Sequence, residues 1–144
     1  MISQSTESKG LFITFEGGEG VGKTTQINLL KSYLLNINYK VVCSREPGGT
    51  IEGEQVRKLL VSGSSKTWDP MSEALMFNAL RRQHINKIIL PSLDKGNIIL
   101  CDRFFDSTIV YQGYAGSIEQ SILKDLHKNF CYNLYLYLLN LDQH

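Results

Sequence analysis

Residues 11–30 read LFITFEGGEGVGKTTQINLL, in which an apolar run, a glycine-rich turn and a helix-like stretch follow one another directly. Residues 17–24 match the pattern G-x-x-x-x-G-K-[ST] at every fixed position. In such a loop, backbone N–H groups turn inward around a polyphosphate, and the following helix adds the positive end of its dipole. The stretch therefore predicts a strand, a phosphate-binding loop and a helix. The residues expected around the phosphates are Gly17, Gly18, Glu19, Gly20, Val21, Gly22, Lys23, Thr24 and Thr25.

The last residues of this loop distinguish a nucleotide site from a simple turn between a strand and a helix. A turn that only joins a strand to a helix also needs glycines, but it gives no reason for Lys23 and Thr24. In a nucleotide site, Lys23 supplies a mobile positive charge and Thr24 supplies a hydroxyl ligand for Mg²⁺. The sequence favours the nucleotide site.

The rest of the chain has the pattern of an α/β fold with a parallel sheet. Apolar runs at 11–16, 41–44, 98–102 and 134–141 alternate with segments of helical periodicity. Because these runs lack polar alternation, helices should cover both faces of the sheet, and ligands should bind at the carboxyl ends of the strands. The predicted helices span about 23–35, 51–61, 70–94, a short segment from 107, and 117–129.

Two helix starts carry recognisable signals. Asp69, just ahead of a proline, can accept backbone N–H bonds, and Ser117-x-x-Gln120 can form a capping box. The sequence shows no internal repeat, low-complexity tract or linker. We therefore expect one domain over 11–144, preceded by a flexible polar tail over 1–10.

Composition limits the partners. The chain has 144 residues with 15 Lys and Arg against 14 Asp and Glu, so its formal charge is +1. That balance argues against nucleic acid or an anionic membrane as a partner. Three cysteines include no C-x-x-C pair, and the apolar run at 134–139 is too short to cross a bilayer. We expect a cytoplasmic protein with reduced thiols.

An acid ends the apolar run at 98–102. Asp102 should lie at the same sheet edge as the phosphate-binding loop, where a carboxylate can approach a Mg²⁺ held by Thr24. An acid in this position can also simply cap the next loop. With the phosphate-binding loop present, the sequence favours Thr24 and Asp102 as the metal-side residues, with Asp102 acting through water.

Two arginines follow predicted strands at this edge, Arg45 with Glu46 beside it, and Arg103. A planar guanidinium with five donors suits a phosphate monoester. The alternative is a surface arginine paired with Glu46 or Asp106. Two phosphate sites in one cleft would mean a donor and an acceptor nucleotide.

Phe77 and Arg81 lie one turn apart on the long predicted helix. An aromatic ring that stacks on a base, with an arginine one turn later, could recognise a pyrimidine. Ordinary core or surface packing is the alternative for this pair. The main core stripe is expected on another arc of the helix, formed by Leu75, Met76, Ala79 and Leu80.

The histidines carry no catalytic pattern. His84, His127 and His144 have neither metal-ligand spacing nor an evident acid partner, and we expect His84 to lie on a solvated face with Arg82 and Gln83. The sequence also shows no Ser-His-Asp or Cys-His set. Phosphoryl transfer needs none, because positioning and cations stabilise its transition state.

A series of short motifs runs in one order along nearly the whole chain. They are Phe15-Glu16-Gly17, Arg45-Glu46-Pro47-Gly48-Gly49-Thr50, Phe77-x-x-x-Arg81, Asp102-Arg103-Phe104, and Ser107-Thr108 leading to Tyr111-Gln112-Gly113.

This ordered set resembles the thymidylate kinase family. The resemblance implies a P-loop NTPase three-layer fold, a homodimer, and ATP- and Mg²⁺-dependent transfer of a γ-phosphoryl group to dTMP, which gives dTDP and ADP. It implies Lys23, Asp102 and Arg103 as catalytic residues. The substrate-binding residues it implies are Glu19, Arg45, Glu46, Arg57, Phe77, Arg81, Arg103, Thr108, Tyr111 and Gln112.

The resemblance also implies a role for each part of the acceptor site. Phe77 stacks on thymine and Arg81 bonds its carbonyl edge, with Thr108 and Gln112 completing the base pocket. The phosphate of dTMP is held by Arg103, with Arg45 and Arg57 near it. The sugar is contacted by Glu19 at its 3′-hydroxyl and by Tyr111, which crowds the 2′ position.

In one respect the chain departs from part of the family. Some members carry an arginine in the phosphate-binding loop where this sequence has Gly20; members without it take that arginine from a lid segment. By this resemblance the lid, a fifth strand and the C-terminal helix follow His144, so we expect the sequence to be C-terminally incomplete.

Several functions therefore remain open. The first is a working thymidylate kinase, and the second is a nucleotide-binding fragment that is catalytically incomplete. The third is another nucleoside monophosphate kinase of the same fold, and the pyrimidine-recognising pair Phe77 and Arg81 is the feature that distinguishes a thymidylate kinase from it. A GTPase-like switch is disfavoured because the chain has no N-K-x-D sequence.

Overall fold

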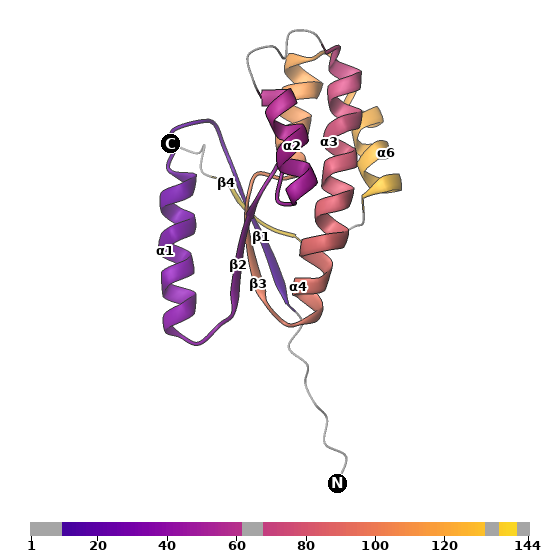
Figure 1. Ribbon diagram of the computed structural model, residues 1–144. Helices are drawn as coiled ribbons and strands as arrows, with labels where there is room; N and C mark the ends of the chain where they lie inside the picture. Colours follow the sequence, from indigo (N-terminus) through magenta and orange to yellow (C-terminus); the bar gives the residue numbers. More distant parts are fainter. Residues whose placement is uncertain (1–9, 62–67, 132–135, 141–144) are drawn as a thin grey trace.

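Four parallel strands form the centre of the molecule (Figure 1). The computed structural model describes residues 10–61, 68–131 and 136–140. The strands lie in the order β2-β3-β1-β4. This arrangement confirms the parallel sheet expected from the four apolar runs. The strands are β1 (Leu11–Glu16), β2 (Val41–Arg45), β3 (Ile98–Asp102) and β4 (Leu136–Asn140).

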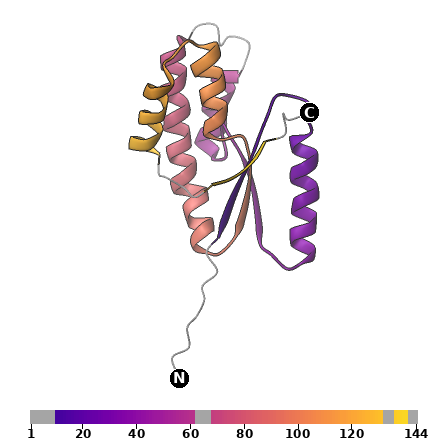
Figure 2. The same ribbon diagram turned by 180° about the vertical axis from the view of Figure 1, so that it is seen from behind.

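Helices cover both faces of this sheet. In Figures 1 and 2, α1 lies on one side, while α3, η2 and α4 descend along the other and α2 lies beyond the carboxyl ends of the strands. The helices are α1 (Lys23–Asn36), α2 (Ile51–Val61), α3 (Pro70–His84), η2 (Ile85–Ile89), α4 (Leu90–Asp94), α5 (Phe105–Thr108), η3 (Ile109–Ala115) and α6 (Gln120–Phe130), of which η2 and η3 are π-helical.

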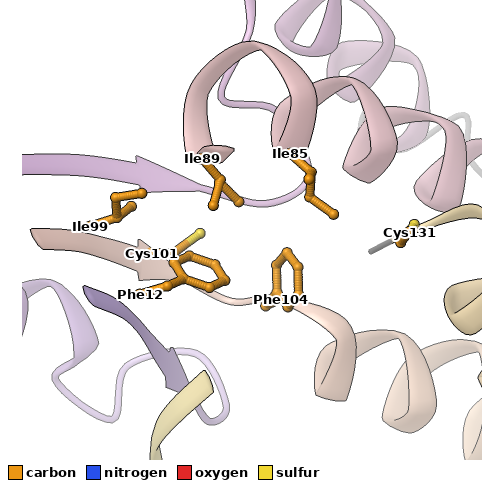
Figure 3. Close-up of a cluster of buried hydrophobic side chains, with 7 residues drawn as sticks. All are labelled: Phe12, Ile85, Ile89, Ile99, Cys101, Phe104 and Cys131. Atoms are coloured by element: carbon orange, nitrogen blue, oxygen red, sulfur yellow. The ribbon is translucent and has the colours of Figure 1, made fainter. Parts of the chain in front are cut away.

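Successive residues of β3 supply the two cores. Ile98 and Leu100 pack toward α1, whereas Ile99 and Cys101 pack toward η2, because side chains alternate across a strand. Each fully buried isoleucine or leucine contributes about 1.5–3 kcal/mol relative to its exposed state. The absence of polar alternation in the sequence therefore reflects a strand that is covered on both sides. Figure 3 shows the core on the η2 side, formed by Phe12, Ile85, Ile89, Ile99, Cys101, Phe104 and Cys131.

The long helix predicted over 70–94 is present, but its regular turns are interrupted. Asp69 caps its start as expected, since its carboxylate accepts the N–H of Ser72 at 3.0 Å. At η2 the backbone changes to a π turn, in which the N–H of Leu90 donates to the carbonyl of Ile85. Pro91 explains the interruption, because proline has no N–H to donate to the helix and its ring clashes with the carbonyl four residues earlier.

The predicted capping box at Ser117 is wrong. Ser117 has a left-handed φ of 57°, and α6 begins three residues later, after Glu119, whose side chain makes no cap bond. The N–H of Ile118 instead donates to the carbonyl of Gln112 and closes the turn that follows η3. The residues around Ser117 are thus used to turn the chain.

No helix in the described ranges is long and apolar enough to cross a membrane.

Candidate active site

The glycine-rich loop has the geometry of a phosphate cradle. Gly20 and Gly22 have φ values of 78° and 93°, in the left-handed region that residues with a Cβ enter only at a cost. The α1 helix begins directly after Gly22, whose carbonyl accepts the N–H of Gln26. The helix N-terminus therefore faces the loop, where unpaired N–H groups and the helix dipole favour an anion.

The Lys23 side chain folds back over this loop. It is 7% exposed, and its Nζ donates to the carbonyl of Gly17 at 2.9 Å and also to that of Gly18. The ammonium group is thus held at the loop itself. The hydroxyl-bearing Thr24 and Thr25 are exposed on the first turn of α1.

A cavity of about 450 Å³ opens beside the carboxyl ends of the strands. It brings together all the substrate-binding residues implied by the sequence resemblance, from four separate parts of the chain. Five lining residues were not singled out in advance. Three of them, Pro47, Phe104 and Ser107, belong to the quoted motifs, whereas Leu60 and Glu73 carry no signal beyond helical spacing. The lining residues are Glu19, Arg45, Glu46, Pro47, Arg57, Leu60, Glu73, Phe77, Arg81, Asp102, Arg103, Phe104, Ser107, Thr108, Tyr111 and Gln112.

The arginines at this cavity differ in how far they are neutralised. Arg45 pairs with Glu54 at 2.7 Å, and not with the Glu46 or Asp106 considered from the sequence. Arg57 donates to the carbonyl of Pro47 at 2.7 Å, and burial lowers the pKa of its guanidinium. Within the described ranges, neither Arg57 nor Arg103 forms an ion pair with a carboxylate. Among the described arginines that line the cavity, Arg57 and Arg103 are thus the two without a carboxylate partner.

A buried carboxylate fixes the turn that carries Arg103. Arg103 has a φ of 68°, a strained value for a residue with a side chain. Glu16 accepts the N–H of Phe104 at 2.6 Å and the hydroxyl of Ser107 at 2.7 Å. Burial raises the pKa of the Glu16 carboxyl, and these two bonds oppose the rise. The turn also presents the Arg103 guanidinium to the ring of Tyr111, 5.4 Å from its centroid.

Arg81 is buried at the back of the cavity. Its side chain is 3% exposed, Nε donates to Glu46 at 2.7 Å, and Nη2 donates to the Thr108 hydroxyl at 2.9 Å. Nη1 is also buried, but it has no partner among the described residues. Phe77 is half-buried and lines the same cavity one turn earlier. Phe77 and Arg81 thus line one cavity from successive turns of α3.

The predicted core stripe of α3 is therefore wrong. Leu75 is 49% exposed and Ala79 is also exposed, while Met76 is only partly buried. Of the predicted arc only Leu80 is buried. The helix turns a polar face inward because these side chains find partners there: the buried residues of α3 are Ala74, Asn78, Leu80, Arg81 and His84.

Two predictions for His84 are also wrong: that it lies on a solvated face, and that it has no acid partner. His84 is 0% exposed, its Nδ1 lies 3.0 Å from Glu46, and its Nε2 lies 2.6 Å from the hydroxyl of Ser44. Glu46 lines the cavity, but its two carboxylate oxygens are occupied by Arg81 and His84. In the sequence these partners stand 35 and 38 positions from Glu46, so no local spacing revealed them.

Asp102 offers an unused oxygen at the end of β3. It lies in register with Arg45 on one side and Phe15 on the other. Its Oδ1 is buried without a hydrogen-bond partner among the described residues, and such an orphaned carboxylate oxygen fits Mg²⁺, which prefers hard oxygen ligands. No cluster of three His, Cys, Asp or Glu occurs in the part of the chain that the structure describes. Mg²⁺ in nucleotide sites needs no such cluster, because phosphates and water supply most of its ligands.

Comparison with known proteins identifies the family. The family model described as thymidylate kinase matches residues 15–144. The chain belongs to the thymidylate kinase family. The crystal structure of thymidylate kinase from Ehrlichia chaffeensis superposes with a TM-score of 0.83 at 45% identity, over 93% of this chain and 72% of that one. This likeness confirms the predicted P-loop NTPase fold of a thymidylate kinase.

Curated thymidylate kinases extend beyond this sequence. The thymidylate kinase of Bartonella quintana (strain Toulouse) is 54% identical over 117 residues, which make up 81% of this chain and 55% of that protein. The thymidylate kinase of Caulobacter vibrioides is 45% identical over 122 residues, 85% of this chain and 59% of the relative. The chain thus spans a little more than half the length of these relatives.

Proposed function

We propose that this chain carries the two nucleotide sites of an enzyme that phosphorylates dTMP to dTDP with ATP, in the biosynthesis of dTTP. One observation carries the proposal: a single cavity joins every residue that the family pattern assigns to the acceptor, and it adjoins the phosphate-binding loop. A smaller hollow of about 200 Å³ includes Gly17 and Gly18 and shares Arg103, Ser107 and Tyr111 with the main cavity. Arg103 therefore stands where donor and acceptor meet.

ATP is the proposed donor at the loop. Its β and γ phosphates would accept hydrogen bonds from the backbone N–H groups of residues 17–22 and from the ammonium of Lys23. Lys23 would then exchange its two carbonyl partners for phosphate oxygens. Thr24 and Asp102 are the residues that would hold Mg²⁺ there. When bound, the ion neutralises charge on the transferring phosphates.

dTMP is the proposed acceptor in the cavity. Phe77 provides a ring for stacking, and the buried Nη1 of Arg81 provides a donor for a carbonyl oxygen of the base. Thr108 and Gln112 are both buried and line the same space. A base with a carbonyl oxygen satisfies this donor, so the site fits thymine, which has two carbonyl oxygens, better than adenine, which has none.

The acceptor phosphate is proposed to bind between Arg57 and Arg103, with Arg45 at the exposed rim. A phosphate dianion there would be bound by the two cavity-lining guanidiniums that have no ion-pair partner in the described structure. Glu19 and Tyr111 line the same cavity and are proposed to contact the sugar. Catalysis would then consist of holding donor and acceptor in line and stabilising the charge that develops between them.

A catalytically incomplete nucleotide-binding fragment is the second candidate. Its support is length, since the sequence spans only 55% of the Bartonella quintana relative. If the transition-state arginine lies in a part of the relatives that this sequence does not span, transfer by this chain alone would be slower by about 10³- to 10⁵-fold while both nucleotides still bind. We further propose that the whole protein acts in the cytoplasm as a homodimer, as the family resemblance implies.

Calorimetric titration with a panel of nucleotides tests the proposal. The chain should bind dTMP and ADP together, with dTMP preferred over dCMP, dGMP and dAMP. Arg81→Ala should weaken dTMP binding roughly tenfold or more, the effect of losing a hydrogen bond from a charged donor, and leave ADP binding unchanged. Equal binding of all monophosphates, or parallel loss of ADP and dTMP binding in the variant, would contradict the assignment.

An assay of ADP release under the same conditions separates the two candidates. A working kinase turns over dTMP at an ordinary rate. Intact binding with a deficit of about 10³-fold or more supports the incomplete fragment.

A further inference from the structure

We propose that His84 is a positioning residue for the acceptor base, which acts on Arg81 through Glu46. Four residues form this arrangement: Ser44 from β2, Glu46 from the loop after it, and Arg81 and His84 from α3. His84 is fully buried and does not line the cavity, so it cannot touch a ligand there. The inference depends on the proposed function at one point only, the contact between Arg81 and the acceptor.

The contacts form an unbroken chain from His84 to the cavity. Nδ1 of His84 lies 3.0 Å from Oε1 of Glu46, and Oε2 of Glu46 accepts Nε of Arg81 at 2.7 Å. Thr108 accepts a second bond from Arg81, through Nη2 at 2.9 Å. With Nε and Nη2 both tied, the guanidinium plane is fixed, and its remaining nitrogen Nη1 has no partner in the described structure.

The chemistry of the carboxylate fixes the direction of these bonds. A carboxylate has only acceptor sites, so Nδ1 of His84 must donate to Glu46. In the neutral ring Nε2 is then an acceptor, which suits the hydroxyl of Ser44 at 2.6 Å as donor. His84 thus holds Oε1 of Glu46, and this contact fixes the direction in which Oε2 faces Arg81.

The loop after β2 is built closely around the His84 ring. A Cβ added to Gly49 would lie 2.6 Å from Cδ2 and 2.7 Å from Nε2 of His84. Gly49 also has a φ of 79°, so this position disfavours any side chain. Since the same loop begins with Glu46, one short segment both packs against the ring of His84 and supplies the carboxylate that the ring contacts.

Two amide variants separate the positioning role from simple filling of the core. In His84→Asn the amide nitrogen occupies the position of Nδ1 and can still donate to Glu46. In His84→Gln the amide reaches the position of Nε2 near Ser44 and leaves Oε1 of Glu46 without a donor. Ser44→Ala removes only the contact at Nε2. A structural role alone would make the three variants follow their changes in stability.

The experiment measures dissociation constants for dTMP and for ADP by calorimetry, with thermal unfolding of each variant. His84→Gln should weaken dTMP binding roughly tenfold, as expected when a bond to a charged group is lost. His84→Asn and Ser44→Ala should stay within about threefold of the wild type, and ADP binding should stay unchanged in all three. In an Arg81→Ala background, His84→Gln should have less than about a twofold effect, because the two residues act in one chain.

Each outcome decides between the proposals. If the wild type binds dTMP and Arg81→Ala weakens it, but His84→Gln binds dTMP as the wild type does, the role of His84 is refuted and the proposed function stands. If the wild type does not bind dTMP, or Arg81→Ala leaves dTMP binding intact, the proposed function itself fails. If His84→Gln does not fold, His84→Ala takes its place: dTMP binding that is tenfold weaker in His84→Ala but close to the wild type in His84→Asn supports the proposal, and equal dTMP binding by these two variants overturns it.

Discussion

Replacement of Glu46 by leucine should destabilise the protein far more than its position at the edge of a cavity suggests. Glu46 is 5% exposed and is the only carboxylate within ion-pair distance of Arg81 in the described structure. The substitution leaves a guanidinium that is 3% exposed without its counter-charge. Breaking a buried pair in this way costs about 3–5 kcal/mol. For a domain of this size, we expect the Tm to fall by roughly 10–20 °C.

A second glutamate in the same protein serves as the control. Glu52 pairs with Lys87 at 2.6 Å, slightly closer than the Glu46–Arg81 pair, but both side chains of this pair are about half exposed. An exposed pair is screened by water, so Glu52→Ala should leave the Tm unchanged within error. Thermal and urea unfolding followed by circular dichroism at pH 7 compares the two variants. Because burial rather than distance decides the cost, equal losses in Glu46→Leu and Glu52→Ala would refute the reasoning.

A double variant sharpens the test. In Glu46→Leu with Arg81→Met, apolar side chains replace both charges, so no buried charge is left without a partner. We expect this protein to recover much of the lost stability, although not its dTMP binding. If the double variant is less stable than Glu46→Leu alone, the unpaired arginine is not the source of the loss.

Three further predictions concern single side chains. Lys23→Ala should abolish detectable ADP binding in calorimetry, because it removes the cation at the phosphate-binding loop; ordinary ADP binding would show that the donor binds elsewhere. Asp102→Asn should remove the difference between ADP affinities measured with and without Mg²⁺ and leave dTMP binding within about threefold; an undiminished Mg²⁺ effect would count against Asp102 as a metal-side residue. His127 stacks on Phe105 at 4.1 Å, and burial, then the charge of Arg81, lower its pKa from 6.5 to about 4. Since the folded state then binds fewer protons than the unfolded state, this contribution to stability is complete above pH 6.5 and is lost as the pH falls toward 4. His127→Phe should therefore lose less stability than the wild type over that range in urea unfolding, by at most about 3 kcal/mol and by less where water reaches the ring. Identical pH profiles would contradict a half-buried histidine that stays neutral in the folded protein.

The sequence predicted what short-range patterns control. The phosphate-binding loop depends on glycines and a lysine within eight positions, and the unbroken apolar runs follow from strands covered on both faces. The residues around the cavity were expected because the order of the motifs resembles that of the thymidylate kinase family. That order was informative because parallel strands bring their carboxyl ends to one edge of the sheet.

What the sequence did not predict depends on contacts between distant segments. The inward face of α3 was assigned by hydrophobicity, but Arg81 and His84 are buried there because Glu46 compensates them from another element. The capping box at Ser117 failed for a similar reason, since the turn after η3 uses that residue in a left-handed conformation. The change to a π turn ahead of Pro91 alters hydrogen bonding without altering the extent of the helix. In each case tertiary structure overrides a local preference.

The most direct measurement is a crystal structure of this chain with ADP and dTMP bound together. We predict that the diphosphate lies along residues 17–24, that the dTMP phosphate lies between Arg57 and Arg103, and that the thymine ring lies on Phe77 with a carbonyl oxygen at Nη1 of Arg81. The central claim, that one crevice binds both nucleotides, is contradicted if either ligand binds outside that cavity or if the pyrimidine ring contacts neither Phe77 nor Arg81.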